Sequence, residues 1–490
     1  MHAKEEFLLE LNPSSDTPLF WQLYQQLRQK ILTGALEPGT QLPPSRKLAQ
    51  ANGLGRVTVT QAYAQLRAEG YVVGKQGAGT FVASDLIAQQ EQTAASTVLS
   101  TSVSTFTPTF SEWGQRVAAN TSAIKPIKPR AEIDFGFGRS FPHIFPYDIW
   151  RRLLARYLST DDVMLSRYGS AAGFYPLREA IAAYLARQRG VNCLPEQVVI
   201  VNGAQQAIDI LGRLFLAAGD EVIVETPGYQ DAFALFSLHG AQLVPIRVDD
   251  QGLPVDQIPT DCNARIAFIT PSNQFPRGGT LPLQRRLALL QWAKKQQALI
   301  FEDDYDGELR YDGRPLGTLY SLDRDGRVIY LGTFSKVLFP ALRLGYVVLP
   351  PQLVAPFVRA KGLVDRGAPT LTQAAIADFI AEGYFERHLR QLRKAYGKRR
   401  LALVEALKRY LEGKVRVTAV PAGLHVMLYL PDHISETEFI AAANKAGVGI
   451  YPGAEYHLEK APPPSILMGF SGLTEAEIEE GVRRLGHLLV

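Results

Sequence analysis

The sequence predicts an α/β protein with a small N-terminal helical domain and a larger domain built on a mostly parallel sheet, with a smaller C-terminal subdomain. Three observations predict this. The chain has 490 residues, more than one compact core holds. Short β-branched runs alternate with helical patterns after residue 132, as in sheets covered on both faces. Residues 84–131 are rich in Ser, Thr, Ala and Gln and predict a linker, so we expect domains at residues 1–83 and 132–490.

The composition excludes several classes of protein. Hydrophobic residues make up 46% and charged residues 20%, which is ordinary for a soluble globular protein. The two cysteines, Cys193 and Cys262, form no CxxC pair, so we expect no disulfide framework, no metal site and a reducing cytoplasmic environment. The N-terminal segment lacks the pattern of a signal peptide. No apolar run approaches the ~18 residues that cross a bilayer.

The first helices of the small domain are visible in the spacing of apolar residues. A first helix precedes Gly34, with apolar side chains at helical spacing in Phe20, Leu23, Leu27 and Ile31. Ser45 is expected to cap a short second helix, which the turn "NGLG" at 52–55 separates from a third. The third helix turns Val59, Ala62, Tyr63 and Leu66 inward, and "YVVGKQGAGTFV" predicts a hairpin. This order predicts a helix-turn-helix followed by a wing.

The exposed side chains of this domain suit DNA. Residues 19–82 hold seven basic and two acidic residues. Arg56, Thr58 and Gln61 lie on the first turns of the third helix, the part that enters the major groove in this motif. Arg56 is suited to a guanine or a phosphate, and Arg46 and Lys47 to phosphates. The alternative is a helical domain with a solvated charged face, which the complete order of helices and wing disfavours.

The larger domain places polar residues where strands end. Five strands are predicted, in "QVVIV", "EVIVE", "RIAFIT", "ALIFEDD" and "RVIYLG", with helices such as "LQRRLALLQWAKKQQ" between several of them. Ligands of such sheets bind just past the carboxyl ends of the strands. A helix-rich tail from about residue 383 predicts the smaller subdomain.

A lysine, Lys336, follows the last of these strands in "LGTFSKVLFPALRLGY". A lysine forms a Schiff base when its amine is kept neutral by desolvation and nearby positive charge. Thr333, Ser335 and Arg343 surround it with groups suited to a phosphorylated cofactor.

Other strand ends add matching groups. Asp303 could hold a pyridine nitrogen protonated, and Tyr305 could donate to a phenolic oxygen. The turn Gly203, Ala204 and Gln205 opens a helix whose N–H groups could bind a phosphate. Tyr229, in "ETPGY", could stack on a ring. Each feature alone is common in ordinary loops, and their occurrence together favours a site for pyridoxal 5′-phosphate (PLP).

The N-terminal segment resembles the winged helix-turn-helix of the GntR family of bacterial regulators in "LTGALEPGTQLPPSRKLA", "GRVTVTQAYAQLRAEGYV" and "GAGTFV". The resemblance implies that Arg46, Arg56 and the wing glycine Gly77 meet double-stranded DNA. One departure is Gly55, where the family usually has a serine that caps the recognition helix.

From about Asp134 onward the chain resembles fold type I aminotransferases. The resemblance implies that Lys336 carries PLP, that Asp303 and Tyr305 hold its ring nitrogen and O3′, and that Tyr229 covers its face. It assigns to the phosphate the residues Ser335, Arg343, Gly203, Ala204 and Gln205. "SRYGSAAGFYPLREAIAAYL" resembles the segment whose tyrosine, here Tyr168, reaches the phosphate of a neighbouring subunit.

Two motifs depart from the aminotransferase pattern. The usual "N-P-x-G" is "NQFPRG" here, and Asn273 is the nearest asparagine to the proline. The arginine that usually holds the substrate carboxylate near the C-terminus is absent from "PSILMGFSG".

Together the two halves resemble the MocR/GabR subfamily of regulators. This implies a head-to-tail homodimer whose aminotransferase-like domain senses an amine, an amino acid or PLP itself. Two alternatives remain: an active aminotransferase with an appended DNA-binding domain, and a DNA-binding protein whose second half is a scaffold without cofactor. The effector, the operator and the direction of regulation are open.

Overall fold

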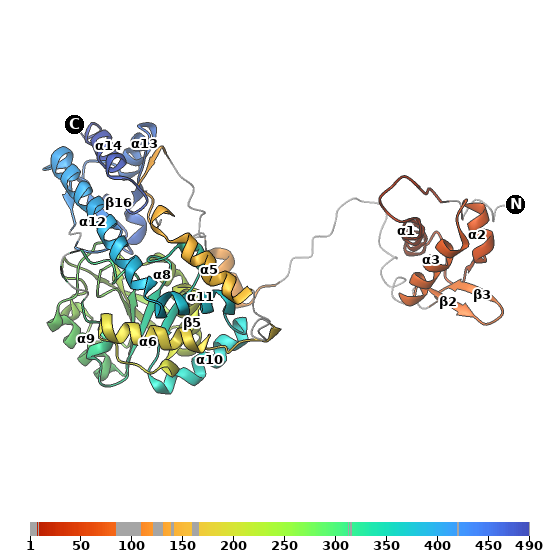
Figure 1. The fold of residues 1–490 in the computed structure, drawn as a ribbon, viewed down its shortest axis with the longest axis horizontal. Helices are drawn as coiled ribbons and strands as arrows, with labels where there is room; N and C mark the ends of the chain where they lie inside the picture. Colours follow the sequence, from red (N-terminus) through yellow and green to blue (C-terminus); the bar gives the residue numbers. More distant parts are fainter. Residues whose placement is uncertain are drawn as a thin grey trace. The chain divides into compact units, whose positions relative to one another are not determined.

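The computed structural model describes residues 7, 9–84, 109–120, 131–138, 142–158, 166–311, 313, 316–418 and 421–489. The chain divides into two compact units, residues 1–108 and 109–490, and each is described by itself (Figure 1). No helix in these ranges is both long and apolar enough to cross a membrane.

The small unit is a helix-turn-helix with a wing. Its helices are α1 (Leu19–Leu32), α2 (Ser45–Ala51) and α3 (Arg56–Ala68). Its strands β1 (Gln41–Leu42), β2 (Val72–Lys75) and β3 (Gly79–Val82) pair antiparallel in the order β1-β3-β2. The predicted inward residues of α3 are all buried: Val59, Ala62, Tyr63 and Leu66.

The helix starts of this unit differ from expectation at one position. Ser45 was expected as a cap, but it is the first residue of α2, and the N-cap is Pro44, whose φ of −53° lies in the range that the proline ring imposes. Helix α3 begins after Gly55, which offers no side-chain cap, so the missing hydroxyl noted in the sequence is confirmed.

The large unit contains a seven-stranded sheet in the order β5-β11-β10-β9-β8-β6-β7. The strands are β5 (Val198–Val201), β6 (Glu221–Thr226), β7 (Gln242–Arg247), β8 (Ile266–Ile269), β9 (Leu299–Asp304), β10 (Val328–Thr333) and β11 (Gly345–Val348). Only β11 runs antiparallel to its neighbours. The five predicted strands are present, and the mostly parallel sheet is confirmed. Strands β7 and β11 were not predicted.

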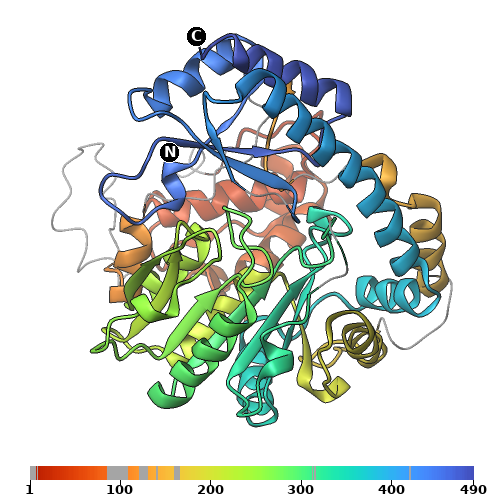
Figure 2. The same cartoon turned by 90° about the vertical axis from the view of Figure 1, so that its left-hand side faces the viewer.

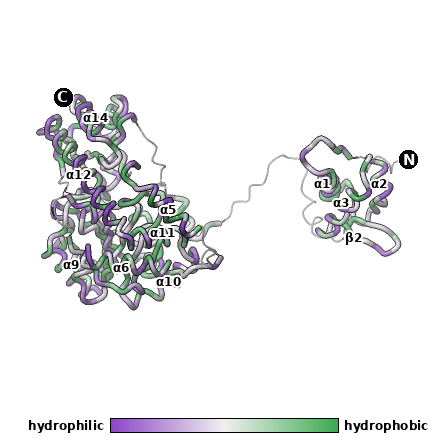
Figure 3. Tube along the Cα trace, in the orientation of Figure 1, coloured by the Kyte–Doolittle hydropathy of each residue, from purple (hydrophilic) through white to green (hydrophobic). Residues whose placement is uncertain are grey.

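Helices cover both faces of this sheet, because successive strand residues point to opposite sides. Val199 and Val201 of β5 share a core with α7 (Ala204–Phe215), α8 (Gln230–Leu238) and α10 (Pro351–Asp365). Val198 and Ile200 pack with α6 (Tyr175–Arg189) and α11 (Thr370–Ala381). Helix α9 (Leu283–Gln296) packs over the neighbouring strands. The largely apolar α11 contrasts with the polar α12 in Figure 3, since α11 is covered by other helices.

The C-terminal subdomain is more than a helix-rich tail. Helices α12 (Tyr384–Leu411), α13 (Glu436–Lys445) and α14 (Glu475–Gly486) accompany an antiparallel sheet of β12 (Arg416–Val417), β13 (His425–Tyr429), β16 (Ser465–Gly469) and β15 (Tyr451–Pro452). An early strand, β4 (Ile133–Asp134), pairs with β14 (Val448–Gly449) of this subdomain. In Figure 2 the blue subdomain lies above the green sheet of the large unit.

Part of the predicted linker, residues 84–131, is helical. Helix α4 (Glu112–Ala119) lies in it and contacts α8, and α5 (Tyr147–Leu158) follows later. Residues 85–108 and 121–130 of the predicted linker lie outside the described residues. The predicted domain boundaries therefore stay a prediction.

Candidate functional site

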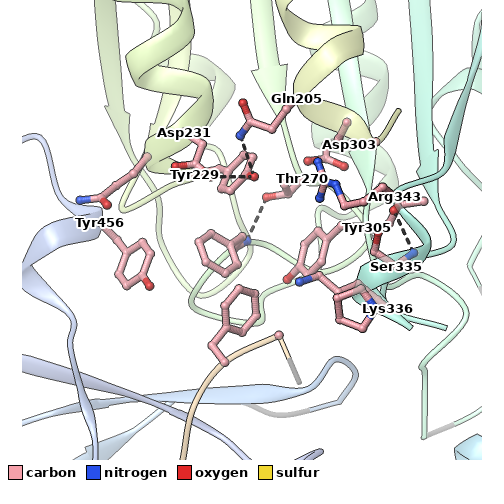
Figure 4. Close-up of a pocket in the computed structure, with 18 residues that line it drawn as sticks. Gln205, Tyr229, Asp231, Thr270, Asp303, Tyr305, Ser335, Lys336, Arg343 and Tyr456 are labelled. Carbon is pink, nitrogen blue, oxygen red and sulfur yellow. Dashed lines mark hydrogen bonds between the residues drawn. The ribbon is translucent and has the colours of Figure 1, made fainter. Parts of the chain in front are cut away.

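Five strands of the large unit end at one cavity of about 380 Å³ (Figure 4). Their carboxyl ends meet because β5, β6, β8, β9 and β10 all run parallel. The predicted residues that line this cavity are Gly203, Ala204, Gln205, Tyr229, Asp303, Tyr305, Thr333, Ser335, Lys336 and Arg343. Residues from five separate stretches of sequence are thus brought together.

Lys336 lies just past β10, with Nζ 4.5 Å from the centre of the Phe137 ring. Burial lowers the pKa of Lys336, and the positive charge of Arg343 lowers it further, while Asp306 and Asp303 oppose the shift. A Cβ placed on Gly138 would come within 3.1 Å of Nζ. The lysine therefore has open space on one side and an environment that favours a neutral, nucleophilic amine.

Asp303 and Tyr305 come from the end of β9. Burial raises the pKa of Asp303 to about 7, and the neighbouring charge of Asp304 adds to the shift. Nδ2 of Asn273 donates to the hydroxyl of Tyr305 at 3.1 Å and to Asp306 at 2.7 Å. Asn273 does not itself line the cavity, so it supports Tyr305 from behind.

The start of α7 forms one wall of the cavity. Gly203 is the N-cap of this helix and has a φ of 89°, a conformation that glycine adopts readily. Its missing side chain leaves room for Arg343, because a Cβ would lie 3.3 Å from Nη2. Nη2 of Arg343 is 3.5 Å from the carbonyl oxygen of Asn202, and the backbone N–H of Ser335 donates to Thr333 Oγ1 at 3.1 Å. The helix N-terminus and Arg343 together suit an anion.

Tyr229 precedes α8 and is held by two polar partners. Its hydroxyl accepts from Nε2 of Gln205 at 2.9 Å and donates to Oδ2 of Asp231 at 3.1 Å. Burial raises the pKa of Tyr229, and the charge of Asp231 adds to the shift. The phenol thus stays protonated, and these bonds fix the ring at the cavity wall.

Two predicted residues do not line this cavity: Asn273, which contacts Tyr305, and Tyr168. Tyr168 is 86% exposed, and its ring centre is 5.7 Å from Cζ of Arg366. It lines a different hollow together with Thr370 and Gln373. The expected role of Tyr168 involves a neighbouring subunit, and a single chain does not test it.

Sequence reasoning missed several residues of the cavity. Thr270 directly follows β8, and the rule of strand ends could have found it. Gln230 and Asp231 adjoin a residue that was predicted. Phe275 lies in the motif "NQFPRG" and Pro340 in the loop after Lys336, although neither was singled out. The remaining lining residues come from distant segments without a signal of their own: Phe137, Gly138 and Tyr456.

In the small unit, the residues predicted to contact DNA lie on the surface. Arg46 and Lys47 are exposed in the first turn of α2, and Arg56 and Gln61 are exposed on α3. Thr58 is half-buried. Gly77 is exposed in the turn between β2 and β3, with a φ of 76°. Val57, which was not predicted, is 70% exposed beside Arg56.

Two family models match the chain. Residues 21–82 match the bacterial regulatory proteins of the gntR family, and residues 144–485 match aminotransferase class I and II. The second match covers more than half of the chain. Members of that aminotransferase family use PLP, and the helix-turn-helix of the first implies DNA binding.

Similar proteins cover both parts. The probable rhizopine catabolism regulatory protein MocR of Rhizobium meliloti is 37% identical over 98% of this chain and 95% of its own. The pyridoxine biosynthesis transcriptional regulator PdxR of Corynebacterium glutamicum is 32% identical over 86% of this chain and 85% of its own.

A solved structure resembles the large unit. The multiple substrate aminotransferase of Thermococcus profundus matches 78% of this chain and 97% of its own, with a TM-score of 0.72 and 31% identity. The two domains in this order, and the similarity to MocR along nearly the whole chain, lead to one conclusion: the chain belongs to the MocR-like transcriptional regulators of the GntR family.

Proposed function

We propose that this regulator holds PLP at Lys336 and uses the loaded cavity to sense an amine, an amino acid or PLP itself. The observation that carries the proposal is the meeting of five strand ends around a lysine whose pKa is lowered. A structural lysine at a protein surface would instead stay charged and solvated.

The cavity offers a partner for each polar part of PLP. The N-terminus of α7, Ser335 and Arg343 suit the phosphate, and Asp303 suits the ring nitrogen. Tyr305, supported by Asn273, suits the ring oxygen, and Tyr229 lies at the wall where a ring would stack. When bound, PLP supplies an aldehyde carbon that primary amines attack. Lys336 would anchor it, and Asp303 would hold the proton on the ring nitrogen.

Regulation requires that the effector bind two states of the protein with different affinity. A difference of ~1–3 kcal/mol is typical of such coupling. An effector that displaces Lys336 changes the charge and packing at the strand ends, next to α8. We infer that this change alters how the two winged helix-turn-helix domains of a dimer are presented to DNA.

The dimer is part of the proposal. Tyr168 is exposed and outside its own chain's cavity, which suits a role at the phosphate of a neighbouring subunit. We expect a homodimer, arranged head to tail. We expect the protein in the cytoplasm, because a protein that binds an operator must reach the chromosome.

Recognition of double-stranded DNA would rest on α3 and the wing. The exposed Arg56 and Gln61 suit contacts with bases, and Arg46 and Lys47 suit contacts with phosphates. Gly77 has no side chain, so the backbone of the wing can approach the DNA closely. The exposed Val57 could contact a thymine methyl group.

The test uses the full-length protein, its operator from footprinting, and a reporter gene. Wild type and Lys336→Ala are compared with PLP depleted and restored, and with amines added. We expect borohydride to trap PLP covalently on wild type alone, and Lys336→Ala to bind the operator but to lose the response to effector. A wild type that ignores both cofactor and amines, but converts an amine and a keto acid, would support the enzyme alternative instead.

A further inference from the structure

The cavity holds one charged group that PLP would leave without a partner. Four charged side chains line it: Lys336, Arg343, Asp303 and Asp231. In the proposed function Lys336 anchors the cofactor, Arg343 binds its phosphate and Asp303 binds its ring nitrogen. Asp231 has no counterpart on the cofactor.

Asp231 lies in the first turn of α8, at the cavity wall. Its only hydrogen bond among the described residues is the one that Oδ2 accepts from the hydroxyl of Tyr229 at 3.1 Å, and no described cation forms an ion pair with it. In Figure 4 Asp231 and Tyr456 lie across the cavity from Lys336, Ser335 and Arg343. The carboxylate thus lies at the wall of the cavity opposite Lys336, next to the hydroxyl of Tyr229.

The walls around this part are aromatic. Phe275 is the centre of the group, with ring centres 5.2 Å from Phe137, 6.0 Å from Tyr229 and 5.2 Å from Tyr456. Aromatic walls are weakly polar and leave less room for water, so the charge of Asp231 is less screened there than at an open surface. An effector carboxylate would meet a like charge there, and an ammonium group would meet its complement.

Resting on the proposed function, we propose that Asp231 binds a second cationic group of the effector. The preferred effector is then an aliphatic diamine, with one amine directed to the aldehyde at Lys336 and the other to Asp231. A structural role for Asp231 is the alternative, because an acidic residue in the first turn also stabilises a helix.

The experiment uses three probes of matched length with different tails: 1,4-diaminobutane, butylamine and 4-aminobutanoate. Each is titrated into full-length, PLP-loaded protein while the visible absorbance of the cofactor and the affinity for operator DNA are recorded. We expect 1,4-diaminobutane to act at the lowest concentration, about tenfold below butylamine, with 4-aminobutanoate weakest.

Asp231→Asn separates charge from structure, because the amide oxygen can still accept the bond from Tyr229. We expect this variant to lose the advantage of 1,4-diaminobutane while its response to butylamine stays within about twofold of wild type. The matched control is Asp148→Asn, which removes a first-turn carboxylate from α5, away from the cavity. The control should keep the wild-type order of the three probes.

Four results would overturn the assignment. Equal responses to diamine and monoamine in wild type would show that the second charge is not recognised. An equal loss for all three probes in Asp231→Asn would show that Asp231 acts only by positioning Tyr229. If no amine acts but operator affinity depends on PLP, the assignment of Asp231 falls and the proposed function stands with PLP as effector. Independence from both PLP and amines would remove the proposed function as well.

Discussion

Arg116, on helix α4, donates a hydrogen bond from Nε to the carbonyl oxygen of Leu238, 2.8 Å away, at the last residue of α8. The free carbonyls at a helix C-terminus favour such a cationic donor. The other end of α8 carries Gln230 and Asp231 into the cavity. Helix α8 therefore lies between the candidate site at one end and helix α4 at the other.

The bond from Arg116 should hold α4 in place, because no residue of α4 is fully buried. We expect Arg116→Ala to raise the hydrogen-exchange rates of the amides in residues 112–120 by roughly fivefold, the effect of losing about 1 kcal/mol. The control is Glu112→Ala, which removes only the 3.8 Å ion pair between Glu112 and Arg116 at the surface. Equal exchange in wild type and Arg116→Ala would contradict the prediction.

The carboxyl group of Asp303 should make the cofactor-free protein less stable as pH rises. Burial raises the pKa of Asp303 to about 7, whereas the unfolded chain releases this proton at about pH 4. The folded state therefore binds more protons between these values, and the stability that the bound proton contributes is lost as pH rises to about 7.

We expect cofactor-free Asp303→Asn to be more stable than wild type at pH 8, on the order of 2 kcal/mol, with a smaller difference at pH 5. Denaturant unfolding at both pH values measures this. The same variant should bind PLP more weakly, which a titration followed by absorbance would show. A difference in stability that does not change with pH would refute the expected titration.

Arg46 and Arg56 should contribute to operator binding in distinguishable ways. An arginine that contacts only a phosphate lowers the salt slope by about one unit when replaced by alanine, and affinity falls on all sequences alike. Replacing an arginine that contacts a base costs about 1–3 kcal/mol of binding free energy and relaxes specificity at one position of the operator. Salt-dependent binding of Arg46→Ala and Arg56→Ala to operator and random DNA separates the two, with the exposed Lys398→Ala of α12 as control. Unchanged affinity in both variants would contradict the assigned DNA face.

Gly55→Ser should stabilise the small unit slightly. Gly55 is the N-cap of α3 with φ −69° and ψ 142°, which serine also adopts, and the nearest atom to a new Cβ is Thr58 Oγ1 at 3.7 Å. A serine hydroxyl there can accept from a free N–H of the first turn, for a gain of a few tenths of a kcal/mol. Gly55→Ala, which has no hydroxyl, is the matched control. A stability of the serine variant at or below that of the alanine variant would show that no cap forms.

The placement of the cavity residues was predictable where polar groups directly follow buried strands. Lys336, Asp303 and Gly203 each adjoin a run of β-branched residues, and parallel strands bring such positions to one edge. Asn273 was expected at the cofactor, and this stays a prediction: Asn273 donates to the hydroxyl of Tyr305 but does not line the cavity itself.

Other features depend on contacts between distant parts of the chain. Phe137 comes from a segment that precedes the seven-stranded sheet along the chain and Tyr456 from one that follows it, and neither segment has a periodic signal. The strand β11 was missed because its run "GYVV" is short and follows the lysine loop. Helix α4 was missed because its sequence is mostly polar and small, and its position depends on docking against α8.

The docking of α4 also limits the spacing of the DNA sites that the proposed dimer could bind simultaneously. Only 26 residues separate Ser84, which follows the last strand of the wing, from Ser111, the N-cap of α4. Even a fully extended chain of that length spans at most roughly 90 Å. Without the anchor at α4, the next described element would be β4, and the largest possible span of the intervening residues would be almost twice as great. Two operator half-sites set too many base pairs apart would therefore fall out of reach of one dimer, and inserting turns of DNA between them should abolish simultaneous binding at a definite spacing.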